Sequence, residues 1–455
     1  MGLYVNSRKP QNNFQETVNS VYFVDKTGLL EELIPIVGPG TRAGNQNGLM
    51  AGQGNKYICI TRPRRFGKTV AANMIAAYFG KGYDGHQIFD GLKIHACEQY
   101  EAHLNQHNVV YITFSEMPGG CGTYEQYILR IQKRILADLM RAYPNACIEE
   151  NDTLWDAFNN IYELEEEVKF IFVLDEWDFI FHRGFVTDQD KKAYLSFLSS
   201  LLKDQPYVEL AYMTGILPIA KYSSGSELNM FFEYTMASEE KYCAYFGFSE
   251  AEVDGLYKIY LEQTAHPKVT REGLRIWYNG YHTMSGGKVY NPRSVAAALT
   301  NNNLGSYWTS SGPYDEIFYY VGKNVDDVRD ALALMVSGVP VRTRVREYAA
   351  SSMGLATKEE ILSAMVVYGF LSCEQGNVFI PNKELMDQFE EMLRKEPSLG
   401  YVYRLAKASD RMLEATISGD TDTLCSILEY AHNTEIPLLS YSNETDQGPR
   451  IRAAF

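Results

Sequence analysis

The sequence predicts an α/β fold in which a parallel sheet is covered by helices on both faces. Two observations support this class. Short apolar segments alternate with longer helical ones through the first 232 residues, which is the pattern of strand–helix–strand units. In addition, the segment that begins at residue 168 reads VKFIFVLD, and such an uninterrupted apolar run is typical of a central strand buried on both faces.

Individual elements follow from local patterns. Strands are predicted at 56–60, 108–114, 168–175 and 208–216. Helices are predicted at 67–80, 124–143 and 191–204. A stretch rich in Gly and Asn at 38–55 is predicted to be a surface loop, because it offers no apolar face to bury.

The chain is long for one domain, and its composition divides it into several parts. The sheet domain is expected at residues 1–232, and a helical, lid-like region at 233–314. Residues 315–440 contain a helix, a hairpin with Gly376 and Asn377 at its turn, and another helix. That order is consistent with a winged-helix-like module. Residues 441–455 form a tail.

The bulk composition narrows the class of function. A net charge of −15 disfavours a protein that coats nucleic acid, so strong DNA binding by this chain alone is not expected. Seven cysteines without a CxxC pair indicate reduced thiols in an intracellular protein. No apolar run approaches the ~18 residues of a membrane helix, and the first residues lack the apolar core of a signal peptide. We therefore expect a cytoplasmic protein that does not enter a membrane.

The segment TRPRRFGKT, residues 61–69, ends as a phosphate-binding loop does. Gly67 allows the backbone to approach phosphate, Lys68 supplies positive charge, and Thr69 supplies a hydroxyl ligand for Mg²⁺. The segment lies between a predicted strand and an apolar helix, where such a loop belongs. Arg62, however, stands where the first glycine is expected. A basic strand-to-helix turn is therefore the alternative interpretation.

An acidic pair at the end of the strand at 168–175 supplies the second half of a nucleotide site. Asp175 is predicted to hold Mg²⁺, and Glu176 to act as the general base for an attacking water. Acidic pairs also end strands as solvated turns. Because the loop and the acidic pair occur in order, each at the end of a strand, the pattern favours a nucleotide site.

Other polar positions have two interpretations each. Asp178 either joins the water network of the site or caps the next turn. Thr214, at the end of the last predicted strand, either senses the γ-phosphate or only terminates the strand. His103 and His107 have the spacing of a helical metal-binding pair, but no second pair accompanies them, so a solvated helix face is expected.

Several segments together resemble a known family. RPRRFGKT (62–69), FVLDEWD (172–178), WYNGY (277–281), VYNPRSV (289–295) and SYWTSSGP (306–313) are similar to segments of bacterial AAA-ATPase-like proteins. The resemblance runs from about residue 3 to residue 443. It implies a P-loop NTPase fold and a hydrolase that uses ATP and Mg²⁺.

The resemblance also implies roles for individual residues. The form RPRRFGK[ST] is the family's own phosphate loop, or Walker A motif, so Arg62 is not a defect. The expected ATP-binding residues are Asp25, Arg62, Pro63, Arg64, Arg65, Phe66, Gly67, Lys68, Thr69, Val70 and Thr214. Thr69 and Asp175 are expected at the Mg²⁺, and Glu176, in the Walker B motif, is the expected base. Asp25 belongs to a motif that lies near the nucleotide base in related ATPases.

The sequence departs from the family at two places. Trp177 stands where the family has Tyr, and we expect it to keep the packing role. The family usually continues into a PD-(D/E)XK nuclease-like domain, and residues 441–455 contain no Glu-x-Lys core of that kind. We therefore assign no nuclease activity to these residues.

Three functions compete on this evidence. The first is an ATPase in which Arg62, Arg64 and Arg65 neutralise phosphate charge, contact a neighbouring subunit or pack under the loop. The second is a nucleotide-gated switch that hydrolyses ATP slowly and presents its C-terminal parts to a protein partner; it is favoured by the lack of an evident arginine finger in the chain. The third is a DNA-directed module based on residues 315–435, which the acidic charge disfavours.

Overall fold

The structure is a computed structural model. It describes residues 2–38, 55–117, 120–165, 168–219, 227–236, 240–283, 286–308, 326–345, 357–395 and 411–435. Most of the predicted loop at 38–55 and the whole predicted tail at 441–455 lie outside the described residues.

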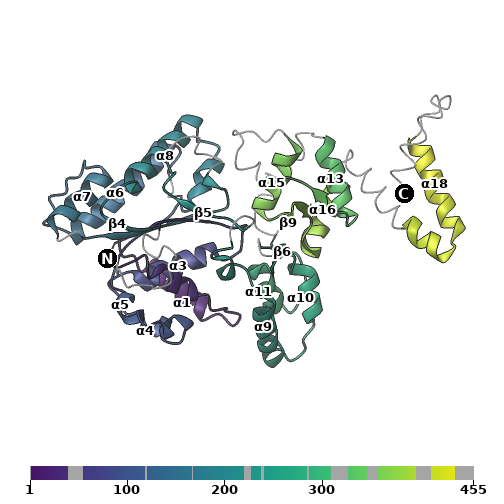
Figure 1. Cartoon of the computed structure of the whole chain (residues 1–455), viewed down its shortest axis with the longest axis horizontal. Helices are drawn as coiled ribbons and strands as arrows, with labels where there is room; N and C mark the ends of the chain where they lie inside the picture. The colour runs from purple at the N-terminus through teal and green to yellow at the C-terminus, as the bar shows by residue number, and fades with distance from the viewer. Residues whose placement is uncertain are drawn as a thin grey trace, which may run out of the picture.

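The sheet domain is built on a five-stranded parallel sheet with the order β2-β3-β4-β1-β5 (Figure 1). The strands are β1 (Tyr57–Thr61), β2 (Asn108–Thr113), β3 (Phe170–Asp175), β4 (Val208–Gly215) and β5 (Phe232–Tyr234). The predicted α/β class is confirmed. The first four strands lie at the predicted places. Strand β5 was not predicted, because three residues are too few to show a periodic pattern.

Helices cover both faces of this sheet, as Figure 1 shows. Alternate strand residues point to opposite faces, so each face has its own core. Phe172 and Leu174 of β3 pack on one side, whereas Ile171 and Val173 pack on the other. The first side is covered by α6 (Tyr124–Ala142), α7 (Leu154–Leu164) and α8 (Asp188–Leu202). The second is covered by α1 (Lys9–Val18), α2 (Gly28–Leu33), α3 (Lys68–Phe79), α4 (His86–Phe89) and α5 (Tyr100–His103).

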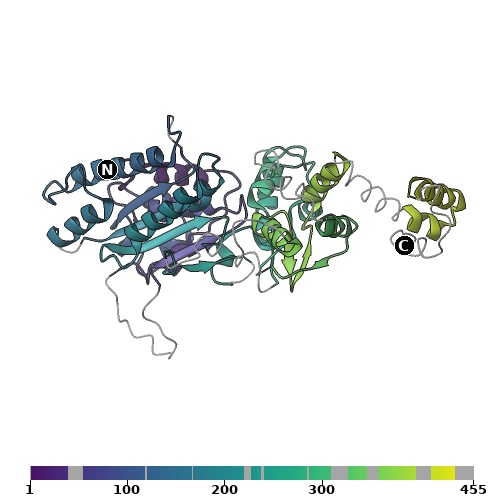
Figure 2. The same ribbon diagram turned by 90° about the horizontal axis from the view of Figure 1, so that it is seen from above.

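Two smaller modules lie beside one end of the sheet in both views (Figures 1 and 2). The first, here called the lid module, has its own core and comprises α9 (Glu250–Gln263), α10 (Arg271–Tyr278) and α11 (Pro292–Thr300). The second, the C-terminal module, comprises α13 (Asp326–Val336), β8 (Val341–Arg342), α15 (Lys358–Tyr368), β9 (Ser372–Glu374), β10 (Asn377–Phe379) and α16 (Lys383–Lys395). Its antiparallel sheet has the order β8-β10-β9. Its assignment as winged-helix-like stays a prediction.

The remaining described elements are short or peripheral. A two-stranded ribbon of β6 (Tyr281–His282) and β7 (Lys288–Val289) follows α10. Short 3₁₀ turns are η1 (Lys93–Ala96), η2 (Trp177–His182) and η4 (Cys243–Tyr245), and α18 (Thr421–Glu435) is the last helix described. Within the described residues, no helix is both long and apolar enough to cross a membrane.

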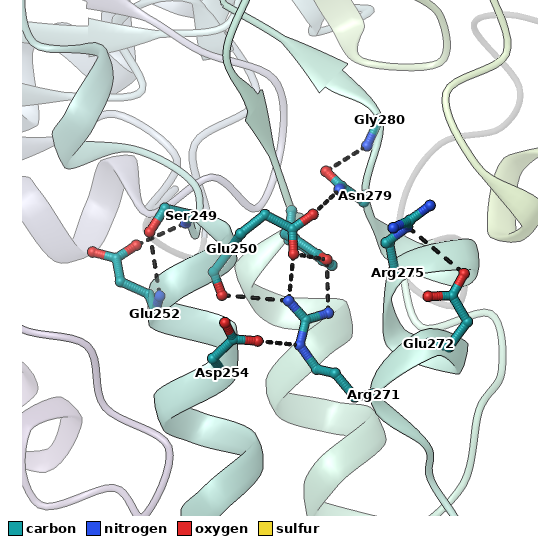
Figure 3. A network of polar contacts seen from close by, with 10 residues as sticks. Ser249, Glu250, Glu252, Asp254, Arg271, Glu272, Arg275, Asn279 and Gly280 are labelled. Atoms are coloured by element: carbon teal, nitrogen blue, oxygen red, sulfur yellow. Dashed lines mark hydrogen bonds and ion pairs between the residues drawn. The ribbon is translucent and has the colours of Figure 1, made fainter.

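A polar network joins the elements of the lid module (Figure 3). The Arg271 side chain on α10 donates to Asp254 of α9 at 2.6 Å and to the Tyr290 hydroxyl at 2.8 Å, and it also pairs with Glu250. Asn279, in the predicted WYNGY segment, donates to Glu250 at 2.8 Å. Because Arg271 and Glu250 serve three segments, α9, α10 and the residues that lead into α11 are held as one unit.

Candidate functional site

The segment between β1 and α3 has the backbone of a phosphate-binding loop. Gly67 precedes the first residue of α3 and has φ 90°, in the left-handed region, where residues with a Cβ are strained. Arg65 also has a positive φ, of 69°. The loop therefore delivers the free N–H groups of the first turn of α3 to the carboxyl edge of the sheet, where an anion would be stabilised.

Lys68 is the first residue of α3 and is 6% exposed. Its ammonium group donates to the carbonyls of Arg62 and Pro63 at 2.8 and 2.9 Å. Burial lowers its pKa to about 8, although the carboxylates of Asp178, Glu176 and Asp175 oppose this shift. The structure thus places the loop lysine within the electrostatic reach of the acidic residues that follow β3.

Asp175 ends β3 and is 1% exposed. Burial raises its pKa to about 6, and the charge of Glu176 adds to the rise, while the nearby Thr69 side chain and Lys68 oppose it. The Thr113 hydroxyl donates to the Oδ2 atom of Asp175 at 3.5 Å. The Oδ1 atom of Asp175 is buried and has no hydrogen-bond partner among the described residues. The predicted Walker A hydroxyl and Walker B carboxylate therefore meet, and they leave one buried acceptor unused.

Glu176 is half-buried and has φ 53°, which is uncommon for a residue with a side chain. The neighbouring Trp177 is fully buried and packs edge-on against Phe181 at 5.4 Å. A Cβ added to Gly215 would approach the Trp177 ring to 2.5 Å, so β4 fits closely against this indole. The packed tryptophan thus fixes the strained backbone that presents Glu176.

Thr214 and Asp178 complete this edge of the sheet in different ways. Thr214 lies on β4, beside Ile60 of β1, and its buried hydroxyl has no partner among the described residues. Asp178 accepts the N–H groups of Ile216 and Leu217 at 2.9 and 2.8 Å. Asp178 therefore caps the turn after β4, 38 residues further along the chain, and not the next turn in sequence, as was considered for it.

Arg62, which replaces the expected glycine, is 1% exposed. Its guanidinium donates to the carbonyls of Thr61 and Tyr234 at 2.8 and 2.7 Å and to the Cys243 sulfur at 3.5 Å. It also lies 5.0 Å from the centre of the Phe246 ring. These contacts join β1 to β5 and η4. They correspond to packing under the loop, which is one of the roles considered for the three arginines.

The outer side of the loop contacts the C-terminal module and two aromatic residues that precede it in the chain. Phe66 is 1% exposed, belongs to the core of the C-terminal module and meets Tyr281 edge-on at 4.9 Å. Pro63 lies against Gly369, where an added Cβ would approach it to 2.5 Å. The carbonyl of Arg64 accepts a hydrogen bond from the Trp308 indole at 3.2 Å. Of the remaining loop residues, Arg64 and Arg65 are half-buried and Val70 is exposed.

Asp25 lies in the segment that leads into α2. Its carboxylate accepts from the backbone and hydroxyl of Thr27 at 2.8 and 2.7 Å and from the Lys93 N–H at 2.7 Å. The adjacent Lys26 donates to the Ala244 carbonyl and to Glu252 of α9. Asp25 thus shapes the backbone of this segment, and Lys26 fastens the segment to the lid module.

The contacts of the loop's outer side were missed by sequence reasoning. WYNGY and SYWTSSGP are family-like segments, but nothing in their spacing indicates that Tyr281 and Trp308 touch the phosphate loop. Such contacts join residues more than two hundred positions apart, and a single sequence carries no local sign of them.

The model of a family described as "Predicted AAA-ATPase" matches residues 49–224. This range holds the loop and the acidic pair, although it is less than half of the chain. No curated protein matches the chain.

Two solved structures are similar to the chain at low identity. The Walker-type ATPase PABY2304 of Pyrococcus abyssi is 13% identical, with a TM-score of 0.41, over 80% of this chain and 94% of that one. The ORC2 protein of Aeropyrum pernix, in ADPNP–ADP complexes, is 12% identical, with a TM-score of 0.39, over 83% of this chain and 99% of that one.

Proposed function

We propose that this chain binds ATP with Mg²⁺ at the loop of residues 62–70 and hydrolyses it. One observation carries the proposal: Lys68 and Thr69, at the start of α3, converge with Asp175 and Glu176, at the end of β3, on one edge of the sheet. A lysine, a hydroxyl and an acidic pair around free helix N–H groups form the set that phosphate and its metal require.

The residues at this edge fit a magnesium ion. Mg²⁺ prefers oxygen ligands and is commonly bound through one or two carboxylates together with the phosphates. Asp175 offers a buried carboxylate oxygen without a partner among the described residues, and the Thr69 hydroxyl adjoins it. We propose these two residues as the protein's contribution to the metal shell. Bound there, the ion would neutralise negative charge on the phosphates.

Hydrolysis is assigned to Glu176. Its half-buried carboxylate follows the proposed metal ligand and is held by a strained backbone between two buried residues, Asp175 and Trp177. A carboxylate in this place orients a water and takes its proton. Thr214 supplies a buried hydroxyl on the neighbouring strand, which is suited to sensing the γ-phosphate.

Binding of ATP with and without Mg²⁺ tests this assignment. Thr69→Val removes the hydroxyl and keeps the shape of the side chain, so it should abolish most of the gain in ATP affinity that Mg²⁺ gives to the wild type. Thr187→Val, which removes the capping hydroxyl of α8 in the same domain, is the matched control and should keep that gain. If Thr69→Val retained the full effect of Mg²⁺, the metal assignment would be wrong.

A nucleotide-gated switch is the second candidate, and the outer side of the loop favours it. Pro63, Arg64 and Phe66 contact Gly369, Trp308 and Tyr281, so a movement of the loop would disturb its contacts with the C-terminal module and the residues before it. A slow ATPase that changes this contact would present the C-terminal module differently to a protein partner or a second copy of the chain.

We also propose a cytoplasmic location for this chain. All seven cysteines are free in the structure, which suits the reducing cytoplasm of a bacterium, the origin that the family resemblance implies. A DNA-directed role for the C-terminal module is less favoured, since the chain carries a net charge of −15.

A further inference from the structure

The carbonyls of three consecutive loop residues are held by side chains from two sources. Those of Arg62 and Pro63 accept from Lys68, the proposed phosphate-binding lysine, at 2.8 and 2.9 Å. The next carbonyl, that of Arg64, accepts from the Trp308 indole at 3.2 Å. Since Trp308 lies outside the sheet domain, the shape of the loop depends on a group from another part of the chain.

Trp308 is itself fixed by a buried carboxylate. Glu384 of α16 is 1% exposed, and its Oε1 accepts the backbone N–H groups of Tyr307 and Trp308 at 2.5 and 2.6 Å. The same oxygen accepts the Ser294 hydroxyl of α11 at 3.2 Å. The indole also packs edge-on against Phe370 at 4.7 Å. One carboxylate thus joins the lid module, the C-terminal module and the tryptophan that touches the loop.

Apolar contacts reinforce this connection. Tyr281 packs against Phe66 of the loop at 4.9 Å and donates its hydroxyl to the Gly369 carbonyl at 3.2 Å. Gly369 in turn lies directly against Pro63. Burial raises the pKa of Glu384; the hydrogen bonds that it accepts oppose this rise, and the positive charge of Arg65 adds a smaller opposing effect. The loop is therefore clamped along its outer side.

We propose that Trp308 and Glu384 are positioning residues that hold the phosphate loop in its binding shape, and that nucleotide binding is coupled to this clamp. The inference rests on the proposed function. When the Lys68 ammonium turns to donate to phosphate oxygens, the Arg62 and Pro63 carbonyls lose their hydrogen-bond donor. The hydrogen bond from Trp308 to the Arg64 carbonyl then becomes more important for holding the loop in shape. Nucleotide binding and the clamp therefore stabilise each other.

The affinity of Trp308→Phe for ATP with Mg²⁺ tests the clamp. This variant keeps an aromatic ring against Phe370 and removes the indole N–H. We expect ATP binding to weaken about three- to tenfold, as for a lost neutral hydrogen bond. Trp277→Phe, on α10, is the matched control, because its indole contacts Lys383 and not the loop, and it should bind ATP as the wild type does.

Indole fluorescence provides a second measurement, which would not respond to ATP at Trp308 if this residue had only a structural role. Addition of ATP with Mg²⁺ should change the emission of the wild type and of Trp277→Phe. The change should be smaller in Trp308→Phe, where the remaining response comes from Trp177, beside Glu176. If Trp308→Phe folds poorly, Glu384→Gln and Glu384→Ala replace it. The glutamine retains an acceptor oxygen and should weaken ATP binding less than the alanine does.

The outcomes separate the clamp from the proposed function. If the wild type binds ATP and Trp308→Phe binds it equally well with an unchanged emission response, the clamp is wrong and the nucleotide site stands. Equal affinities of Glu384→Ala and the wild type would also overturn the clamp. If the wild type fails to bind ATP, the proposed function falls and the clamp falls with it.

Discussion

The two ends of the central sheet carry polar clusters of opposite character. At the amino end, Glu209 of β4 pairs with His107 at 3.2 Å, and His107 pairs with His103 at 3.0 Å. At the carboxyl end, the buried Asp175 Oδ1 and Thr214 hydroxyl have no partner among the described residues. The side chains of the first cluster pair with one another, whereas the second cluster leaves polar atoms to which a ligand could bind.

This difference separates structural polar groups from functional ones. Buried polar groups in proteins are nearly always hydrogen-bonded, so unpartnered ones call for a specific cause. The sequence predicted a solvated face for His103 and His107, and this was wrong: His103 is 7% exposed and both rings are paired. Among the described residues no group suited to a metal includes them. Their hydrogen bonds therefore serve the packing of side chains at the amino end of the sheet.

The largest expected effect is on the rate of ATP turnover, when a carboxylate is removed from the carboxyl end of the sheet. Glu176→Gln should slow ATP hydrolysis by about 100-fold or more, because it removes a general base, while ATP still binds. Glu209→Gln makes the same change at the amino end and should leave turnover within about twofold of the wild type. Steady-state phosphate release measures both. Unchanged turnover in Glu176→Gln would remove its catalytic assignment.

A second prediction concerns Arg62, the structural residue of the carboxyl end. Arg62→Met should lower the free energy of unfolding by about 2–3 kcal/mol, because it leaves buried carbonyls of Thr61 and Tyr234 without a donor. Arg64→Met, on a half-buried side chain, should cost less than about 1 kcal/mol. Urea unfolding compares the two. Equal losses would show that Arg62 has no special role beneath the loop.

A third prediction tests the backbone of the loop. Gly67→Ala should cost about 1–2 kcal/mol, through the left-handed φ of 90° alone, because an added Cβ meets no atom within 4 Å. Gly91→Ala is the control, since its Cβ also meets nothing and no positive φ is recorded there. Midpoints of thermal unfolding, measured with and without ATP, report the loss of stability. A Gly67→Ala protein as stable as Gly91→Ala would contradict the strained loop.

The smallest effect is expected at the amino end. Burial, and then the charge of His107, lowers the pKa of His103 below its usual 6.5. The unfolded chain therefore binds this proton more readily, so the stability contribution is complete above pH 6.5 and is lost as the pH falls below it. His103→Gln should make stability depend less steeply on pH between 6.5 and 5 in urea unfolding. An unchanged slope would argue against a neutral, paired His103.

Local patterns were sufficient to predict most of the sheet and the centre of the site. A strand, a loop ending in Gly67-Lys68-Thr69 and an apolar helix are neighbours in sequence, and β3 leads straight into Asp175 and Glu176. The burial of a charged residue depends on partners that are distant in the sequence. Arg62 reaches Tyr234 and Cys243, which are more than 170 positions away, so its role under the loop could not be predicted.

The central claim is that Lys68 and its neighbours form an ATP site, and calorimetric titration with ATP and Mg²⁺ tests it most directly. The wild type should bind one ATP per chain, and Lys68→Ala should bind at least about tenfold more weakly, because it loses charged hydrogen bonds to phosphate. Lys56→Ala, at the amino end of β1, should bind normally. Equal binding by Lys68→Ala and the wild type, or no binding by the wild type, would contradict the claim.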